Sequence, residues 1–168
     1  MAHKFLPKAP TTKNGPERFA GDVWVDPIAY PQEEGQRMIV ARVRFAPGAH
    51  TAWHSHAKGQ TLHVTSGVAL FGTRDGTVVE AVPGETVYCP AGEEHWHGAT
   101  PEDFMEHLAM LENADDPSQT TRWLEHVAEG EYRRPGSGKN QTRKGADGAM
   151  RAARSGAARH RILSESKA

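Results

Sequence analysis

The sequence predicts a small all-β domain, built as an antiparallel sandwich or barrel of short strands. Residues 37–48 alternate apolar and polar side chains, with the odd positions from Ile39 to Phe45 apolar and the intervening Arg42 and Arg44 charged. Residues 68–82 hold two β-rich runs joined at an Asp-Gly dipeptide, which is typical of a hairpin. Gly and Pro recur at close intervals between such runs, and this spacing favours a two-sheet architecture.

Further strands are expected in the middle of the chain. Residues 61–67 form a β-rich run that ends at a glycine, and residues 83–92 combine a turn, a strand and a second turn. Residues 104–111 alternate apolar and polar side chains again. Four glycines at the ends of these runs are expected to adopt the positive φ that turns require: Gly48, Gly67, Gly84 and Gly92.

The segment 118–134 is open to two interpretations. Thr121, Trp123 and Val127 follow the alternation of an edge strand, and we favour a strand over 121–127 followed by a helical turn. The composition of the segment would also permit a short helix. The two interpretations differ in whether this segment extends a sheet.

Charge is divided unevenly along the 168 residues. Residues 1–133 contain 19 acidic and 11 basic side chains, a net charge of −8, whereas residues 134–168 contain two acidic and nine basic side chains, a net charge of +7. We therefore expect an N-terminal arm over 1–19, a folded domain over 20–133, and a basic Gly/Ala/Arg-rich tail over 134–168. The tail has too few large apolar side chains to offset the entropy of ordering, so we expect it to be disordered.

The basic tail raises the question of nucleic-acid binding. Its charge would suit an anionic surface, but no aromatic side chain is interleaved with the basic ones to stack on bases, so a solvated tail is favoured. Cys89 is the single cysteine, which excludes an intrachain disulfide and a cysteine-based metal site. The absence of a long apolar run predicts no membrane span, and we expect a cytoplasmic protein.

Histidine is concentrated in the stretch WHSHAKGQTLHV, residues 53–64. Side chains at positions i and i+2 of a strand share a face, so His54 and His56 point the same way. The AKG segment that follows can turn the chain and bring Gln60 back beside the pair. The same alternation puts His63 on the opposite face, which makes it a predicted non-ligand.

A second pair, His95 and His97, follows in the stretch PAGEEHWHG. A His-x-His pair with a distant third histidine and an oxygen donor is the usual inventory of a mononuclear three-histidine, one-oxygen metal site. Trp53 and Trp96 flank the two pairs on the opposite strand face. We expect these tryptophans to pack between the sheets and to fix the orientation of the histidines.

The spacing of these residues resembles the two motifs of the cupin family. The first motif corresponds to Gly48, His54, His56, Gln60 and Gly67, and the second to Gly84, Pro90, Gly92 and His95. The resemblance covers about residues 20–133 and implies a double-sheet jelly-roll barrel that encloses a divalent metal. Carried over by position, the implied metal ligands are His54, His56, Gln60 and His95.

Two longer stretches, GAHTAWHSHAKGQTLHVTSG and PAGEEHWHGATPEDFMEHLAM, resemble the small bacterial cupins that include the manganese-dependent, (R)-selective hydroxynitrile lyases. Glutamine is the regular oxygen ligand of that subgroup, so Gln60 fits it. The resemblance implies catalytic roles for His97 and His107 and substrate-pocket roles for Ala41, Val43 and Leu111. Two positions depart from the patterns: Leu111 stands where those lyases have glutamine, and Ala99 where the second motif usually has asparagine.

Gln60 has a direct electrostatic consequence. A carboxylate would lower the formal charge of a divalent site to +1, whereas a neutral amide oxygen leaves it at +2. Such a centre favours an anionic additional ligand, polarises a carbonyl and lowers the pKa of bound water. It also disfavours oxidation of the metal, so Lewis-acid or lyase chemistry is expected ahead of oxygen activation.

The sequence thus predicts a metal-dependent enzyme that acts on a small carbonyl- or hydroxyl-bearing molecule, most like a hydroxynitrile lyase with histidine as the acid/base. One divalent metal per subunit is expected, with Mn favoured and Fe, Co, Ni or Zn as alternatives. The competing functions are a metal-dependent dioxygenase or isomerase of a small phenolic or sugar-like substrate, and a non-catalytic ligand-binding cupin. The resemblance also implies a homodimer or homotetramer.

Overall fold

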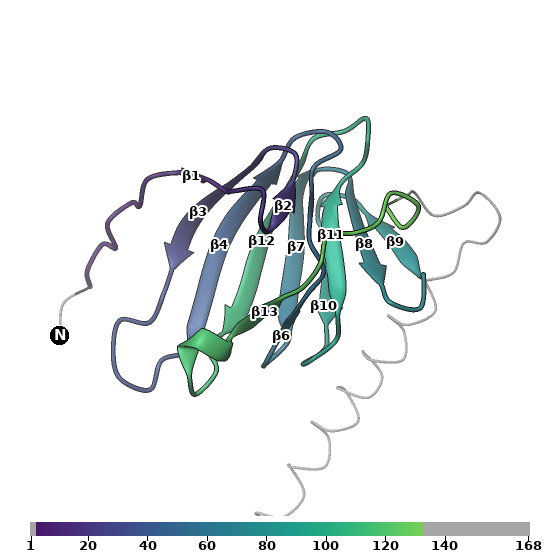
Figure 1. Ribbon diagram of the computed structural model, residues 1–168. Helices are drawn as coiled ribbons and strands as arrows, with labels where there is room; N and C mark the ends of the chain where they lie inside the picture. Colours follow the sequence, from purple (N-terminus) through teal and green to yellow (C-terminus); the bar gives the residue numbers. More distant parts are fainter. Residues whose placement is uncertain (1–2, 133–168) are drawn as a thin grey trace, which may run out of the picture. The chain divides into compact units, whose positions relative to one another are not determined.

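A computed structural model describes residues 3–132 of the chain (Figure 1). The chain divides into two compact units, Met1–Pro135 and Gly136–Ala168, and the described residues all belong to the first. The expected basic tail over 134–168 lies outside the described residues. Within residues 3–132, no helix is both long and apolar enough to cross a membrane.

The described unit consists of two antiparallel sheets, which confirms the predicted all-β fold of two curled sheets. The first sheet has six strands in the order β1 (Thr12–Lys13), β3 (Val23–Ala29), β4 (Met38–Phe45), β12 (Met105–Glu112), β7 (Gln60–Gly67) and β10 (Thr86–Cys89). Because β4, β12 and β7 are neighbours although they are far apart in sequence, the inward side chains of three distant segments share one wall (Figure 1).

The second sheet has seven strands. Along it run β13 (Thr121–Trp123), β6 (His54–His56), β11 (His95–Ala99), β5 (His50–Thr51) and β2 (Phe19–Ala20), and β11 also pairs with the hairpin of β8 (Ala69–Thr73) and β9 (Val78–Ala81). A 3₁₀ turn, η1 (Pro117–Gln119), precedes β13. This sheet therefore carries both histidine pairs on adjacent strands.

The structure refines two expectations about the ends of the domain. The expected strand over 121–127 is shorter, because pairing with β6 covers only Thr121–Trp123, and a turn closes after it through the hydrogen bond from Glu131 N to Ala128 O at 2.9 Å. In the described part of this segment, up to residue 132, the only helical element is the end of η1 (Pro117–Gln119). The arm over 1–19 contributes structure, since β1 pairs with β3, and Phe19 in β2 pairs with β5.

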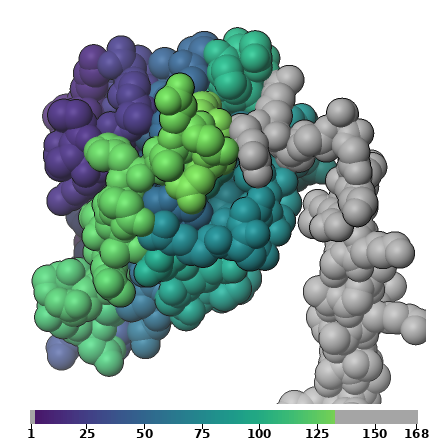
Figure 2. Space-filling view, turned by 45° about the vertical axis from the view of Figure 1, so that its right-hand side comes forward, coloured from purple at the N-terminus to yellow at the C-terminus, as the bar shows by residue number. Residues whose placement is uncertain are grey.

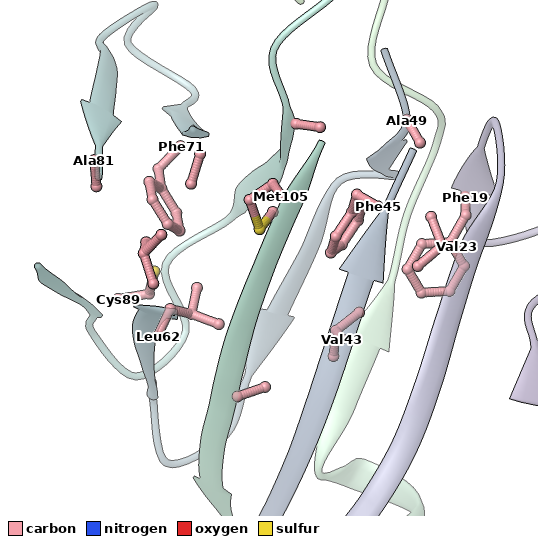
Figure 3. Packing of buried hydrophobic residues seen from close by; sticks show 14 residues of the cluster. Phe19, Val23, Val43, Phe45, Ala49, Leu62, Phe71, Ala81, Cys89 and Met105 are labelled. Carbon is pink, nitrogen blue, oxygen red and sulfur yellow. The ribbon is translucent and has the colours of Figure 1, made fainter. Parts of the chain in front are cut away.

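The main hydrophobic core lies between the sheets. Figure 3 shows Val43, Phe45 and Met105 of the first sheet pointing into the same interior as Phe19 and Phe71 of the second. The period-two alternation of β4 explains its contribution, because every second side chain must enter the space between the sheets. Cys89 is buried within this core, as expected of a small hydrophobic residue, and burial raises the pKa of its thiol to about 12.

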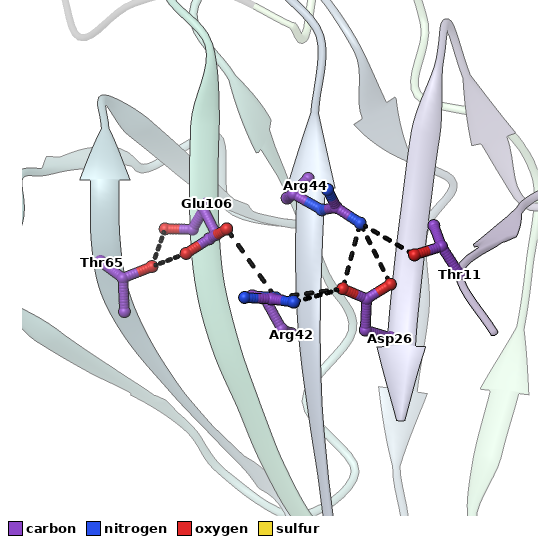
Figure 4. A network of polar contacts seen from close by, with 6 residues as sticks. All are labelled: Thr11, Asp26, Arg42, Arg44, Thr65 and Glu106. Atoms are coloured by element: carbon purple, nitrogen blue, oxygen red, sulfur yellow. Dashed lines mark hydrogen bonds and ion pairs between the residues drawn. The ribbon is translucent and has the colours of Figure 1, made fainter. Parts of the chain in front are cut away.

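The other face of β4 carries a polar network (Figure 4). Arg42 Nη2 donates to Asp26 Oδ2 at 2.7 Å, and Arg44 Nη2 donates to both carboxylate oxygens of Asp26 at 3.0 Å. Across the next strand, Glu106 accepts a hydrogen bond of 2.8 Å from Thr65 Oγ1 and lies 4.0 Å from Arg42 Nε. The network links β3, β4, β12 and β7 on the side of the sheet away from the core.

The four turn glycines adopt the positive φ that the sequence predicts, with values of 78°, 73°, 92° and 78° at Gly48, Gly67, Gly84 and Gly92. Two of them differ sharply in their surroundings. A Cβ on Gly67 would lie 1.6 Å from the carbonyl oxygen of Phe104, whereas a Cβ on Gly84 would meet nothing within 4 Å. Gly67 is therefore required by both conformation and packing, and Gly84 by conformation alone.

Replacing these two glycines by alanine should separate the two effects. Gly84→Ala should lower the free energy of unfolding by about 1–2 kcal/mol, the cost of a left-handed conformation for a residue with a Cβ. Gly67→Ala should lower it by at least about 3 kcal/mol, because the backbone of β12 must also move. Urea denaturation followed by circular dichroism measures both, and equal losses in the two variants would contradict this packing argument.

Candidate metal centre

The two histidine pairs meet because β6 and β11 are antiparallel neighbours. His54 and His95 are direct cross-strand partners, and their ring centroids are 4.4 Å apart. His56 follows on the same face of β6, with its ring 5.1 Å from that of His54 and 5.6 Å from that of His95. All three rings are buried, so the strand pairing converts two motifs some 40 residues apart into one cluster.

Gln60 reaches this cluster from the opposite sheet. It is the first residue of β7, and its Oε1 lies 3.2 Å from Nε2 of His95. The turn over residues 57–59 brings Gln60 back to the cluster, as expected, and the side chain is buried. An amide oxygen therefore points at the face of the cluster on which the histidine nitrogens lie.

The outer ring nitrogens of the histidines are held by hydrogen bonds. His54 Nδ1 lies 3.0 Å from the carbonyl oxygen of Ala52, and His95 Nδ1 lies 3.0 Å from that of Glu93. A carbonyl oxygen can only accept, so each Nδ1 carries the hydrogen and each Nε2 keeps a free lone pair. His56 Nδ1 contacts Thr121 Oγ1 at 3.1 Å, and its buried Nε2 has no hydrogen-bond partner.

These observations fit a divalent metal. Three imidazole nitrogens and an amide oxygen are a donor set that transition metals accept, and metal-bound histidines usually donate their second nitrogen to an oxygen, as these rings are placed to do. The unpartnered Nε2 of His56 is the kind of buried atom that a metal would satisfy. The predicted ligand set of His54, His56, Gln60 and His95 is thus chemically consistent with the structure.

One neighbour adds a further donor. Among the described residues, the group that could hold a metal consists of His54, His95 and His97, whose ligand atoms all lie within 4.8 Å of one another. This group contains His97 and not His56. The family resemblance gives His97 a catalytic role and makes His56 a metal ligand. Because His95 and His97 share a face of β11, His97 necessarily lies at the edge of any centre built on His95.

His97 and His107 form a buried pair across the two sheets. His107 Nε2 lies 3.3 Å from His97 Nδ1, and neither ring is exposed appreciably. Phe45 packs against both rings, at centroid distances of 5.7 and 5.6 Å. The backbone N–H of His97 donates to Thr51 Oγ1 at 3.1 Å. The two facing nitrogens share one hydrogen, and when it lies on Nδ1 of His97, Nε2 of His97 keeps a lone pair.

Burial keeps every histidine of the cluster neutral. Desolvation lowers the pKa of His56 to about 4 and that of His107 to about 3, and it holds the pKa values of His54 and His97 well below 6.5, with help from neighbouring histidines. The pKa of His95 is lowered by the same cause. Neutral imidazoles keep the lone pairs that a metal ligand or a general base requires.

A cavity of about 160 Å³ opens beside the cluster. Of the predicted site residues it is lined by Val43, His54, His56, Gln60, His97, His107 and Leu111. Ala41 does not line the cavity; it packs against the edge of the main core. The predicted ligand His95 does not line the cavity either, although it contacts Gln60, which does. The other predicted metal and acid/base residues share the cavity, as do two of the three predicted pocket residues.

A part of the cavity wall that was not predicted from the sequence comes from β13 and β2. Trp123 stacks on His54 with ring centroids 4.8 Å apart, and it packs against Phe19 at 5.6 Å. Thr121 and Trp123 share a strand face, which the alternation of this segment already indicated. The pairing of β13 with β6 is a long-range contact for which the local sequence carries no signal.

The expectation that Trp53 and Trp96 pack between the sheets was wrong. They form a second cluster with Leu70 and Val127, separate from the main core, on the back of the second sheet. The segment after β13 covers this face and lies at the surface of the molecule, where Figure 2 shows it in green against the teal middle of the chain. Alternation correctly put the tryptophans on the face opposite the histidines, but because both faces of this sheet are buried, it could not say which face looks into the space between the sheets.

The covering segment is itself anchored. Tyr132 stacks on His50 at 4.1 Å and donates its hydroxyl hydrogen to the carbonyl oxygen of Ala99, while the guanidinium of Arg74 lies 3.9 Å above the ring of Trp53. Arg74 also pairs with Glu125 at 2.7 Å. These contacts therefore hold the covering segment against the outer face of the strands that carry the histidines.

His63 confirms the predicted parity of β7. It lies on the face away from the cavity, where its Nδ1 contacts Thr86 Oγ1 at 2.9 Å. His63 is not among the residues that line the cavity or in the group of histidines that could hold a metal.

The lowered pKa values predict a loss of stability in acid. A histidine whose pKa is lower in the folded state binds more protons when unfolded, so the free energy of unfolding falls as the pH drops below 6.5, by up to about 1.4 kcal/mol per pH unit for each histidine. For His107 the fall in the free energy of unfolding should continue to about pH 3.

Urea denaturation with a chelator present should therefore show that the free energy of unfolding changes less steeply with pH, between pH 6.5 and 4.5, in His107→Gln than in the wild type. The exposed His126 supplies the control His126→Gln, and the same slope in all three proteins would refute the assignment.

Comparisons with known proteins agree with this architecture. The family model described as "Cupin domain" matches residues 41–109. Over 116 residues the chain is 43% identical to the (R)-mandelonitrile lyase of Granulicella tundricola, a match that covers 69% of this chain and 86% of that protein.

Solved structures show the same fold. A cupin-like protein of Thermotoga maritima is 31% identical, with a TM-score of 0.68, and the match covers 82% of this chain and all of that one. A polyketide cyclase of Streptomyces resistomycificus superimposes with a TM-score of 0.59 at 18% identity, over 78% of this chain and 91% of the cyclase. Together with the two sheets and the histidine cluster between them, these matches establish the family: the chain belongs to the cupins.

Proposed function

We propose that this cupin is a metal-dependent lyase that cleaves and forms cyanohydrins of small aldehydes. The observation that carries the proposal is the arrangement of the cavity, in which three inward histidine nitrogens and Gln60 lie beside the neutral pair of His97 and His107. The 43% identity to a mandelonitrile lyase supports the same reaction class. A metal-binding cluster and a separate pair of proton carriers are the two components that such a reaction needs.

In the proposal, His54, His56, Gln60 and His95 hold one divalent metal, and we propose Mn²⁺. Their outer nitrogens contact Ala52, Thr121 and Glu93, which leaves the inner nitrogens available to a metal. When bound, the metal supplies positive charge that polarises the oxygen of the substrate. Gln60 adds no negative charge, so this positive charge stays uncompensated by the protein.

The proton is handled by His97. In the cleavage direction, Nε2 of neutral His97 accepts the hydroxyl proton of the cyanohydrin while the bond between the carbinol carbon and the nitrile carbon breaks. The electron pair of that bond leaves with cyanide, the carbonyl forms, and cyanide leaves as HCN after taking the proton back from His97. His107 contacts Nδ1 of His97 and so orients the ring and stabilises its charged form.

The cavity supports a small substrate. Its volume of about 160 Å³ is below the roughly 300–1,000 Å³ of sites for drug-sized ligands. Val43, Ala109, Leu111 and Trp123 line it beside the histidines and Gln60, and they give apolar surface against which an aryl or alkyl group of an aldehyde can pack. A small molecule that carries both polar and apolar groups matches this lining.

Metal content and cyanohydrin cleavage test the proposal together. Purified protein should contain about one divalent metal per chain by elemental analysis, and the Mn²⁺-loaded protein should release benzaldehyde from mandelonitrile, measured by absorbance. His97→Ala should lower kcat by about 10²–10⁴-fold, the usual contribution of a general base, and should retain the metal. His126→Ala, at an exposed position, is the matched control and should leave both readouts unchanged.

Two outcomes would contradict the proposal in different ways. Protein that takes up no divalent metal would refute the metal site itself. Protein that binds metal and leaves mandelonitrile intact, but consumes oxygen with a small phenol when loaded with Fe²⁺, would replace the lyase by a dioxygenase.

Gln60→Glu tests the electrostatic role of the amide. The added carboxylate should tighten Mn²⁺ binding by about tenfold or more, since it adds an opposite charge in direct contact. The same charge should weaken the binding of benzoate to the loaded protein by about tenfold. Competition with a chelating dye measures the metal, and calorimetry measures benzoate. Gln119→Glu, at an exposed position, is the control, and unchanged benzoate affinity in Gln60→Glu would remove the electrostatic argument.

A further inference from the structure

The three histidines proposed as ligands differ in what holds their outer nitrogen. His54 and His95 each face a main-chain carbonyl oxygen, that of the residue two positions earlier, at 3.0 Å. His56 faces a side-chain hydroxyl instead, Thr121 Oγ1 at 3.1 Å, from a strand 65 residues further along the chain. Two ligands are therefore oriented by their own strand, and the third by β13.

The two kinds of partner have different chemistry. A carbonyl oxygen only accepts, so it fixes the hydrogen on Nδ1 and leaves Nε2 with a lone pair. A hydroxyl group either accepts from Nδ1–H or donates to an unprotonated Nδ1. His56 is thus the one member of the set whose outer nitrogen faces a hydroxyl, while the backbone carbonyl of Thr120 also hydrogen-bonds its ring.

We propose that Thr121 is a positioning residue that selects the metal-binding tautomer of His56. This inference rests on the metal site proposed above. With metal present, the hydroxyl accepts from Nδ1–H and turns the lone pair of Nε2 to the centre. Without metal, the hydroxyl reverses its role in part of the molecules, and His56 populates both tautomers.

The surroundings hold Thr121 in place. Its cross-strand partner in the pairing of β13 with β6 is His56, and Trp123 is the partner of His54, on which it stacks. The backbone of the preceding residue is also tied to this site, since Ala57 N donates to the carbonyl oxygen of Thr120 at 3.1 Å. Thr121 also lines the cavity, and Nε2 of His56 is buried without any partner. The hydroxyl therefore meets a histidine whose buried inner nitrogen a metal would satisfy.

Metal affinity tests the positioning role. Thr121→Val keeps the shape of the side chain and removes the hydroxyl, so the dissociation constant for Mn²⁺ should rise by about 10–100-fold, the usual effect of losing a hydrogen bond to a ligand histidine. Thr121→Ser keeps the hydroxyl and should stay within about threefold of the wild type. Thr86→Val is the matched control, because it removes the same kind of contact from His63, on the other side of β7.

Nuclear magnetic resonance tests the tautomer directly. Long-range ¹H–¹⁵N spectra of the full chain should show His54 and His95 with the hydrogen on Nδ1 before and after addition of Zn²⁺, a diamagnetic substitute. His56 should show both tautomers without metal and the Nδ1–H form alone with Zn²⁺. In Thr121→Val the resonances of His54 and His95 should keep their form.

The possible results test the metal site and the role of Thr121 separately. Wild-type protein that binds neither metal would overturn both the proposed function and this inference. Wild-type protein that binds metal, with Thr121→Val equally tight, would overturn the inference alone. So would Thr121→Ser as weak as Thr121→Val, or a single unchanging tautomer of His56 in the wild type.

Discussion

The cross-strand pairing of His54 with His95 is the constraint on which the rest of the site depends. It places two short motifs on adjacent antiparallel strands, with their ring nitrogens on the inner face. The inner face is buried, so the histidines there are neutral, and their outer nitrogens find oxygen partners. Ligand geometry, tautomer and charge state thus all follow from one register between two strands.

The second sheet needs support on both faces to keep that register. Its inner face bears the histidines, which contribute little hydrophobic free energy, and its strands are as short as three residues in β6. The tryptophans on the outer face, covered by residues 124–132, add apolar burial to that supplied by Phe19 and Phe71 on the inner face. The packing around Trp53 and Trp96 on the outer face therefore stabilises the sheet whose inner face carries the histidines.

The sequence predicted most of the elements and much of the candidate site, because period-two alternation and turn glycines are local signals. They assigned His54 and His56 to one face of their strand, His95 and His97 to one face of theirs, His63 to the face opposite Gln60, and the hairpin to residues 68–82. What could not be predicted depends on long-range pairing. The approach of Thr121 and Trp123 to the histidines, the outer position of Trp53, and the closeness of His97 to the ligand group require knowledge of which strands lie side by side.

The network around Asp26 has a consequence for how this barrel can change. Arg42 and Arg44 tie β4 to its neighbours from the solvent side, while Val43, between them, faces the cavity. Alternate residues of β4 therefore have two roles. The outward arginines keep the strands aligned, and the inward side chains shape the cavity. Substitutions at the inward positions can reshape what the barrel accepts without touching the contacts that keep its strands aligned, so one scaffold can acquire new substrates in single mutational steps.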